Sequence, residues 1–216
     1  MSDLIIKPSG TNANFKVQNP SGTDKIVMNS SGVMTTLPPG MVIEEFMSPC
    51  DGSSITVQSG TYTVGTVSAA QSLSQSYADI TGSSIDYTPP TGTQTVVYTF
   101  SLHWTYDDDD PYNLASFKLF LDNDSGTATE VTNFRTQLGG QAYIEGRYTF
   151  VWAFNIGGST TAATGRVATW TSARTIKMQC REYYSSNESQ LHTTNNWDDT
   201  SSNQFSQPVI GIKALS

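Results

Sequence analysis

Aspartates form the densest group of potential metal ligands in this sequence. Four of them are consecutive and sit in a turn-like segment, namely Asp107, Asp108, Asp109 and Asp110. Asp122 and Asp124 follow in a second turn-like segment. Hard carboxylate oxygens are the ligands that Ca²⁺ prefers, so calcium is the one cofactor that the sequence suggests. The D-x-D-x-D-G spacing of calcium loops is missing, so we favour a solvated acidic turn that discourages edge-to-edge pairing of strands. Apart from calcium, we expect no cofactor.

Aromatic residues outside the regular strand patterns are the second candidate, for ligand binding. Tyr183 and Tyr184 precede Ser-Ser-Asn, and Trp197 lies within Asn-Asn-Trp-Asp-Asp. An aromatic ring can stack on a sugar while neighbouring amides and carboxylates hydrogen-bond to its hydroxyls. We therefore treat these three residues as candidate contacts to a glycan or receptor. For Trp197 the simpler interpretation is a loop anchor that packs on the main domain.

Residues suited to catalysis are sparse. His103 falls on the polar face of an expected strand, and His192 falls in a polar loop. Glu44 and Glu45 are adjacent in an expected strand and so point to opposite faces, which does not suit the paired carboxylates of a glycosidase. The sequence has no G-x-S-x-G, H-E-x-x-H, P-loop or G-x-G-x-x-G motif. These observations predict a protein that is not an enzyme.

Composition excludes several kinds of partner. Eleven Lys and Arg against 19 Asp and Glu give a net charge of -8, which argues against nucleic-acid binding through phosphates. No run of about 18 apolar residues is present, so we expect no membrane insertion. The start, MSDLIIKPSG, lacks a basic stretch before an apolar core, so we expect no signal peptide. We favour a reduced state for Cys50 and Cys180, with a disulfide between them as the alternative.

Strict alternation marks the longest strand. In TVVYTFSLHWTY, residues 95–106, polar residues occupy the odd positions except Val97. A period of two gives one buried and one solvated face, which is typical of an antiparallel sheet. The apolar positions of this strand are Val96, Tyr98, Phe100, Leu102, Trp104 and Tyr106.

Similar strands recur toward the C-terminus, in RYTFVWAFN, TIKMQCREY and PVIGIKALS. Gly-, Asn- and Asp-rich turns separate them, and no segment has a sustained helical period. The natural arrangement for so many strands with one buried face is two packed sheets. We therefore predict an all-β protein with an antiparallel jelly-roll or β-sandwich head over residues 40–216.

Residues 1–39 have a different pattern. Ser-Gly pairs at 9–10, 21–22 and 31–32 end short strand-like units, each with a pair of apolar residues. Such thin ribbons expose their apolar side, and an isolated ribbon is marginal in water. We therefore predict an intertwined, trimerising or virion-attaching stem, with an arm packed on the head as the alternative. Its predicted core consists of Leu4, Ile6, Phe15, Val17, Ile26 and Met28.

These units carry a resemblance to a known family. KPSGTNANFKVQNPSGTDKIVMNSSGVMTT resembles the triple β-spiral shafts of viral fibres. SYADITGSSIDYTPPTGTQTVVYTFSLHW, RYTFVWAFN and PVIGIKALS are similar to the jelly-roll modules of fibre-like proteins of tailed bacteriophages. The resemblance implies a homotrimer on the virion surface, with its stem directed to the particle and its head outward. It supplies no functional residues to carry over.

The sequence thus predicts a structural virion protein of a tailed phage. As a homotrimeric fibre or spike, it would project from capsid or tail, contact other virion proteins, and bind a host-surface glycan or receptor. The first alternative is a capsid-decorating cement protein that stabilises the head shell. The second alternative is a polysaccharide-degrading spike. It is disfavoured because the sequence has neither a long β-helix repeat nor a paired acid site.

Overall fold

A computed structural model describes residues 14–32, 34–106, 113–140, 144–183, 189–193 and 205–216. In these ranges nearly all regular structure is β-strand, which confirms the predicted all-β class. Two short 3-10 turns, η1 (Thr132–Phe134) and η2 (Ala162–Thr164), are the helical elements there. No helix in the described part of the chain is long and apolar enough to cross a membrane.

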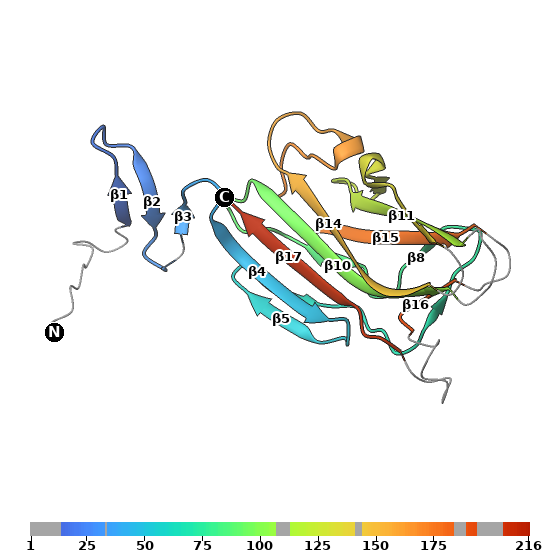
Figure 1. Cartoon of the computed structure of the whole chain (residues 1–216). Coiled ribbons are helices and arrows are strands. Elements are labelled where there is room, and N and C mark those ends of the chain that lie inside the picture. The colour runs from blue at the N-terminus through green and yellow to red at the C-terminus, as the bar shows by residue number, and fades with distance from the viewer. Residues whose placement is uncertain (1–13, 33, 107–112, 141–143, 184–188, 194–204) are drawn as a thin grey trace.

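The first large sheet, sheet I, is built around the longest predicted strand (Figure 1). All its pairs are antiparallel, and β14 lies on the opposite edge of β10 from β17 and β16. Its strands are β4 (Val42–Pro49), β17 (Val209–Leu215), β10 (Thr95–Tyr106), β16 (Ser189–Leu191), β7 (Gln71–Ser72) and β14 (Ile144–Asn155).

The second large sheet, sheet II, is also antiparallel and centres on β11 and β15. Its strands are β12 (Ala128–Glu130), β11 (Asn113–Asp122), β15 (Arg174–Glu182), β8 (Ala78–Asp79), β13 (Thr136–Gly140) and β9 (Ile85–Tyr87). A separate hairpin follows β4 in the chain and consists of β5 (Ser54–Val57) and β6 (Gly60–Thr63).

The predicted buried face of β10 is confirmed. Every even position from 96 to 106 is at most 2% exposed, and the odd positions are half-buried except Thr105. The same holds on β15, where Ile176, Met178 and Cys180 are buried, and on β17 for Ile210 and Ile212. Alternation therefore identified the inward face of each long strand correctly.

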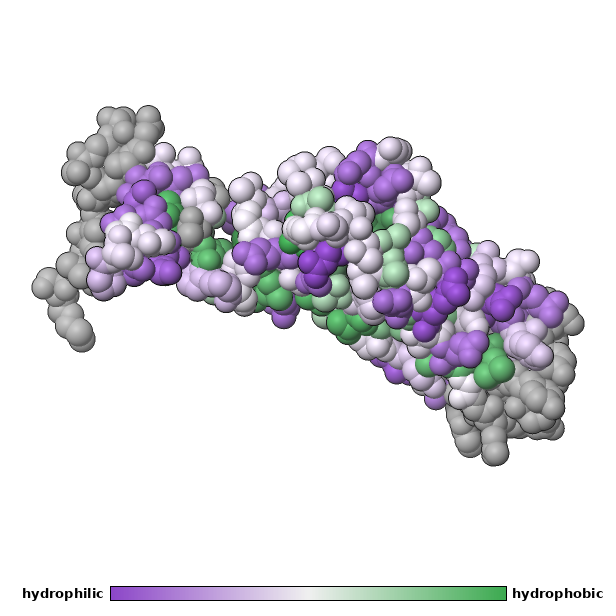
Figure 2. Space-filling view, turned by 90° about the horizontal axis from the view of Figure 1, so that it is seen from above, coloured by the Kyte–Doolittle hydropathy of each residue, from purple (hydrophilic) through white to green (hydrophobic). Residues whose placement is uncertain are grey.

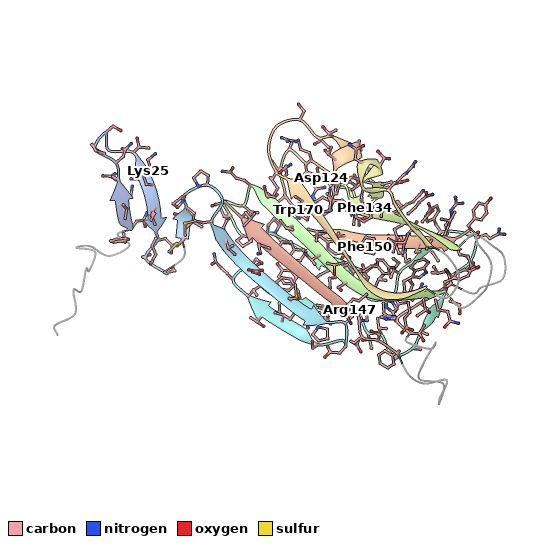
Figure 3. The ribbon with its side chains drawn as sticks, in the orientation of Figure 1. Lys25, Asp124, Phe134, Arg147, Phe150 and Trp170 are labelled. Atoms are coloured by element: carbon pink, nitrogen blue, oxygen red, sulfur yellow. The ribbon has the colours of Figure 1, made fainter. Side chains whose placement is uncertain are left out.

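Aromatic side chains fill the space between the two sheets. The ring of Phe117 on β11 lies 4.7 Å from that of Phe150 on β14, and the rings of Phe154 and Trp170 are 6.0 Å apart. Figure 3 labels Phe134, Phe150 and Trp170 in this layer. Burying each such ring stabilises the fold by about 2 to 3 kcal/mol. The molecule is therefore a β-sandwich, as predicted.

The N-terminal strands form a third sheet, separate from the sandwich. β1 (Phe15–Gln18), β2 (Asp24–Met28) and β3 (Met34–Thr36) make an antiparallel meander. Its turns contain Gly22 and Gly32 at φ of 78° and 80°, which confirms that the Ser-Gly pairs at 21–22 and 31–32 end strand units. The pair at 9–10 lies outside the described residues. Figures 1 and 2 show this sheet beyond one end of the sandwich, connected to it by a narrow neck.

Ser216, which follows β17, hydrogen-bonds to the neck, the segment between β3 and β4. The Ser216 hydroxyl donates to the Pro38 carbonyl oxygen at 2.6 Å, and the Met41 amide donates to the Ser216 hydroxyl at 3.2 Å. The chain leaves the N-terminal sheet after β3 and enters sheet I at β4, close to the predicted boundary between residues 39 and 40. The division into a stem and a head stays a prediction, as does the intertwining of the stem.

Candidate self-association and ligand-binding surfaces

Apolar side chains of the N-terminal sheet gather on one of its faces. Phe15 pairs with Met28, and Val17 pairs with Ile26, and residues directly opposite on antiparallel strands share a face. Met34 on β3 extends this face because it lies opposite Met28. We call these five residues the stem stripe.

A single chain covers the stem stripe incompletely. Val17 is 41% exposed and Met34 is 36% exposed, and the other three members are half-buried. By contrast, Val27 on the opposite face is only 5% exposed. The predicted members Leu4 and Ile6 lie outside the described residues. The stripe therefore remains a candidate surface for contact with further copies.

A second apolar surface lies on the outer face of sheet I. One row of opposed residues crosses four strands of this face. It consists of Met47 on β4, Gly211 on β17, Thr99 on β10 and Val151 on β14. Met47 is 63% exposed and Val151 is 57% exposed. The missing side chain of Gly211 lets Met47 lie over it, since a Cβ there would be 3.3 Å from the Met47 Cε. We call these four residues the sheet I row.

Sequence reasoning missed the sheet I row because it concentrated on the buried faces. The available signal was an uncharged stretch on the other face of β14, where Thr149, Val151 and Ala153 alternate with the aromatic residues. Met47 and Val151 are exposed in this row, whereas Thr99 is half-buried and Gly211 is buried. Exposed apolar side chains are expected where another protein surface is to be met.

The predicted ligand-binding aromatics are only partly described. Tyr183 follows β15 and is 60% exposed. Its backbone is held in place, because its amide donates to the Leu114 carbonyl at 2.9 Å and its carbonyl accepts from Gln75 Nε2 at 2.9 Å. Tyr184 and Trp197 lie outside the described residues. Their role in binding a ligand stays a prediction.

Only one of the two acidic segments is described. Asp107, Asp108, Asp109 and Asp110 all lie outside the described residues. Asp124 forms an ion pair with the buried Arg174, which also donates to the Asp122 carbonyl oxygen at 2.9 Å. These residues line a small cavity of about 90 Å³. Among the described residues, no three His, Cys, Asp or Glu side chains group as metal ligands.

Glu44 and Glu45 point to opposite faces of β4, as predicted. Glu45 pairs on the surface with Lys213 at 2.9 Å. Glu44 is buried and accepts hydrogen bonds from the Ser59 amide at 2.8 Å, the Ser59 hydroxyl at 2.6 Å and the Tyr87 hydroxyl at 2.8 Å. Burial, together with this bond to Glu44, raises the pKa of Tyr87. The geometry is that of a structural network linking β4 to β9 and the β5–β6 turn.

The two histidines differ in environment. His103 lies on the outer face of β10, with its Nε2 3.5 Å from Glu145 Oε1. His192 follows β16 at a positive φ of 63° and is fully buried, although the sequence suggested a polar loop. Burial lowers the pKa of His192 to about 4. In the described ranges neither imidazole hydrogen-bonds to a hydroxyl or thiol, the arrangement that would activate a nucleophile.

Both cysteines are free and buried, so the disulfide alternative is wrong. Cys50 donates from its thiol to the Gly82 carbonyl at 3.3 Å, and burial raises its pKa to about 12. Cys180 is 1% exposed on the inward face of β15, where it packs as a small apolar side chain.

Comparisons with known proteins give weak likenesses only. No family model and no curated protein matches the chain. A structure of infectious bursal disease virus, Gx strain, is 9% identical with a TM-score of 0.39, over 96% of this chain and 42% of that one. The VP2 subviral particle of the same virus is 8% identical with a TM-score of 0.33, over 96% and 47%. The CBM36-1 domain of a xylanase from the hindgut metagenome of Trinervitermes trinervoides is 13% identical with a TM-score of 0.26, over 78% and 96%.

The chain thus spans less than half the length of the viral proteins it matches. At these levels of similarity no functional residue is transferred to it.

Proposed function

We propose that this chain is a structural protein of a virus particle that forms a homotrimer and presents its sandwich to a host surface. The observation that carries the proposal is the stem stripe, which one chain leaves incompletely covered. Three copies around one axis would bury the stripe and pair the free strand edges of the meander. The sheet I row offers a second surface on which the heads could pack.

Exposed apolar residues connect these two surfaces. Met41 and Val42, at the neck, are 41% and 48% exposed. Met41 precedes β4 and Val42 is its first residue, so in the chain they follow the stem stripe and open the first strand of sheet I. Contact between heads along sheet I would leave sheet II facing outward. Three weakly binding heads would then gain strength through multivalency.

The virion setting is supported by the resemblance of the Ser-Gly units to viral fibre shafts. Such a trimer would project from capsid or tail as a fibre or spike. Quantifying the protein in purified particles would separate this role from capsid decoration, because a decorating protein covers the shell in many more copies than a fibre.

Sedimentation of the purified full chain tests the self-association. We expect a particle three times the mass of the 23.4 kDa chain. The double variant Val17→Ser, Met34→Ser should shift it toward monomer. The matched control is Lys25→Ser, because Lys25 is exposed on the other face of β2 (Figure 3). A folded wild-type chain that stays monomeric at high concentration would contradict the proposal.

A further inference from the structure

We infer that the outer face of sheet II carries a binding groove for an acidic polysaccharide. The inference rests on the proposed attachment role and names the chemistry of the ligand. The groove has a volume of about 490 Å³. Its walls contain Tyr77, Ser116, Lys118, Arg135, Gln137 and Arg181, which we call the sheet II groove.

Strand register places these side chains together. Arg181 on β15 is opposite Ser116 on β11, which in turn is opposite Gln137 on β13. Lys118 lies two residues from Ser116 and therefore on the same face. This face points away from the core, because the alternating neighbours Phe117 and Cys180 are buried.

The groove keeps positive charge in a protein whose net charge is -8. Glu130 accepts from Lys118 Nζ at 3.1 Å and from Arg135 Nε at 2.6 Å, so one carboxylate serves two cations. The bond from Arg135, assisted by Lys118, holds the pKa of Glu130 below its usual range. Within the described ranges, no carboxylate lies within ion-pair distance of the exposed Arg181.

Tyr77 positions two of the cations. Lys118 Nζ lies 4.2 Å from the centroid of the Tyr77 ring, and the Arg181 guanidinium carbon lies 4.9 Å from it. Cation–π attraction favours these placements. Long basic side chains held in this way lose less conformational freedom when an anion binds.

Uncharged polar groups lie between the cations. Gln137 Nε2 donates to the Ser116 hydroxyl oxygen at 3.2 Å, which leaves the hydroxyl hydrogen and the amide oxygen for a ligand. Hydroxyl-bonding groups among separated cations match a sugar chain that carries carboxylate or phosphate groups. Arg181 can bind either oxyanion through two parallel N–H groups.

Nucleic acid fits this groove less well. Cations already engage the Tyr77 ring, so it is not a free platform for stacking a base. A single-stranded DNA oligomer therefore serves as a competing probe in the test below.

Calorimetric titration of the purified full chain at low salt tests the inference. The probes are oligogalacturonate for carboxylate, yeast phosphomannan for phosphate, neutral dextran, and the DNA oligomer. We expect binding to one or both acidic glycans that weakens with added salt, and none to dextran. Arg181→Gln should weaken it about tenfold or more, since one charge-assisted contact is lost. Lys213→Gln removes the same charge from sheet I and should leave binding unchanged.

The two acidic probes distinguish a carboxylate ligand from a phosphate ligand. If neither acidic glycan binds, or if Arg181→Gln and Lys213→Gln behave alike, the inference is overturned. It is also overturned if DNA binds more tightly than both glycans. Sedimentation of the same samples reports the trimer independently, so loss of glycan binding in an intact trimer would overturn the groove and leave the self-association standing.

Discussion

Arg174 and Asp124 form an ion pair whose two ends lie in very different environments. The Arg174 side chain is 4% exposed, whereas that of Asp124 is 78% exposed. The guanidinium also donates to the carbonyl oxygens of Asp122 and Thr169, and it lies 5.9 Å from the Trp170 ring. A surface carboxylate thus neutralises a cation buried under the β11–β12 turn. From the sequence, Asp124 was a weaker calcium candidate beside the favoured solvated turn; in the structure its carboxylate pairs with Arg174.

Substituting Asp124→Asn should therefore destabilise the fold although the residue is exposed. Arg174 keeps its carbonyl partners but loses its counter-charge, at a cost of about 1 to 2 kcal/mol. Urea denaturation measures the change in free energy of unfolding. Glu45→Gln is the matched control, because its pair with Lys213 is exposed at both ends and should contribute about 0 to 0.5 kcal/mol. Equal effects of the two variants would show that the burial of Arg174 does not matter.

Glu44→Ala should be among the more destabilising single changes in the sandwich. It removes the acceptor of three hydrogen bonds and leaves the Tyr87 hydroxyl buried without its partner. We expect a loss of roughly 3 kcal/mol. Glu44→Gln should cost less, because its amide oxygen can still accept. Thermal unfolding compares both with Glu45→Ala, and a small effect of Glu44→Ala would show that the network contributes little.

Val151→Glu should weaken the proposed trimer without unfolding the monomer. Val151 is already 57% exposed, so a polar side chain costs the single chain little. In a trimer whose heads pack along sheet I, the substitution brings like charges together. We expect the association constant to fall about tenfold or more. Ala128→Glu adds the same charge to an exposed strand position on sheet II and should not change sedimentation; if both variants remain equally trimeric, the heads do not pack through the sheet I row.

Acid should destabilise the protein through His192 before its carboxylates titrate. The folded pKa of about 4 lies below the ordinary value of 6.5, so the unfolded chain binds the proton first. This contribution is fully present above pH 6.5 and is lost as the pH falls toward 4, by roughly 3 kcal/mol in total. His192→Asn, whose side chain tolerates the positive φ, should remove the pH dependence in that window. Urea midpoints measured from pH 7 to pH 4 test this expectation, and an unchanged slope in the variant would refute it.

Features of the fold that depend on residues close together in the sequence were predictable, and features that depend on distant residues were not. The buried face of β10 and the glycine turns of the N-terminal meander were predicted correctly, because alternation and positive φ depend on a few neighbouring residues. The environment of His192 was not predicted. Its imidazole contacts a residue distant in sequence, because the Thr81 carbonyl oxygen lies 3.1 Å from Nε2.

The candidate sites likewise divide into one that local sequence indicated and one that depends on the pairing of distant strands. Tyr183 was correctly singled out as an exposed aromatic, from its position beyond a regular strand. The sheet II groove had no signal in the sequence, because Lys118, Arg135 and Arg181 are scattered among polar residues. Only the pairing of β15 with β11, and of β11 with β13, brings them to one face.

By itself the sequence determined the all-β class and the inward face of each long strand, and it grouped Phe15, Val17, Ile26 and Met28, which share one face of the N-terminal sheet. Each of these follows from the period of side chains along one extended segment. Tertiary structure alone decided which strands are neighbours, and with that the network of Glu44, the pair of Arg174 with Asp124 and the sheet II groove. The physical reason is that strand pairing joins residues far apart in the chain, and the hydrogen bonds that fix it are between backbone groups that every residue carries.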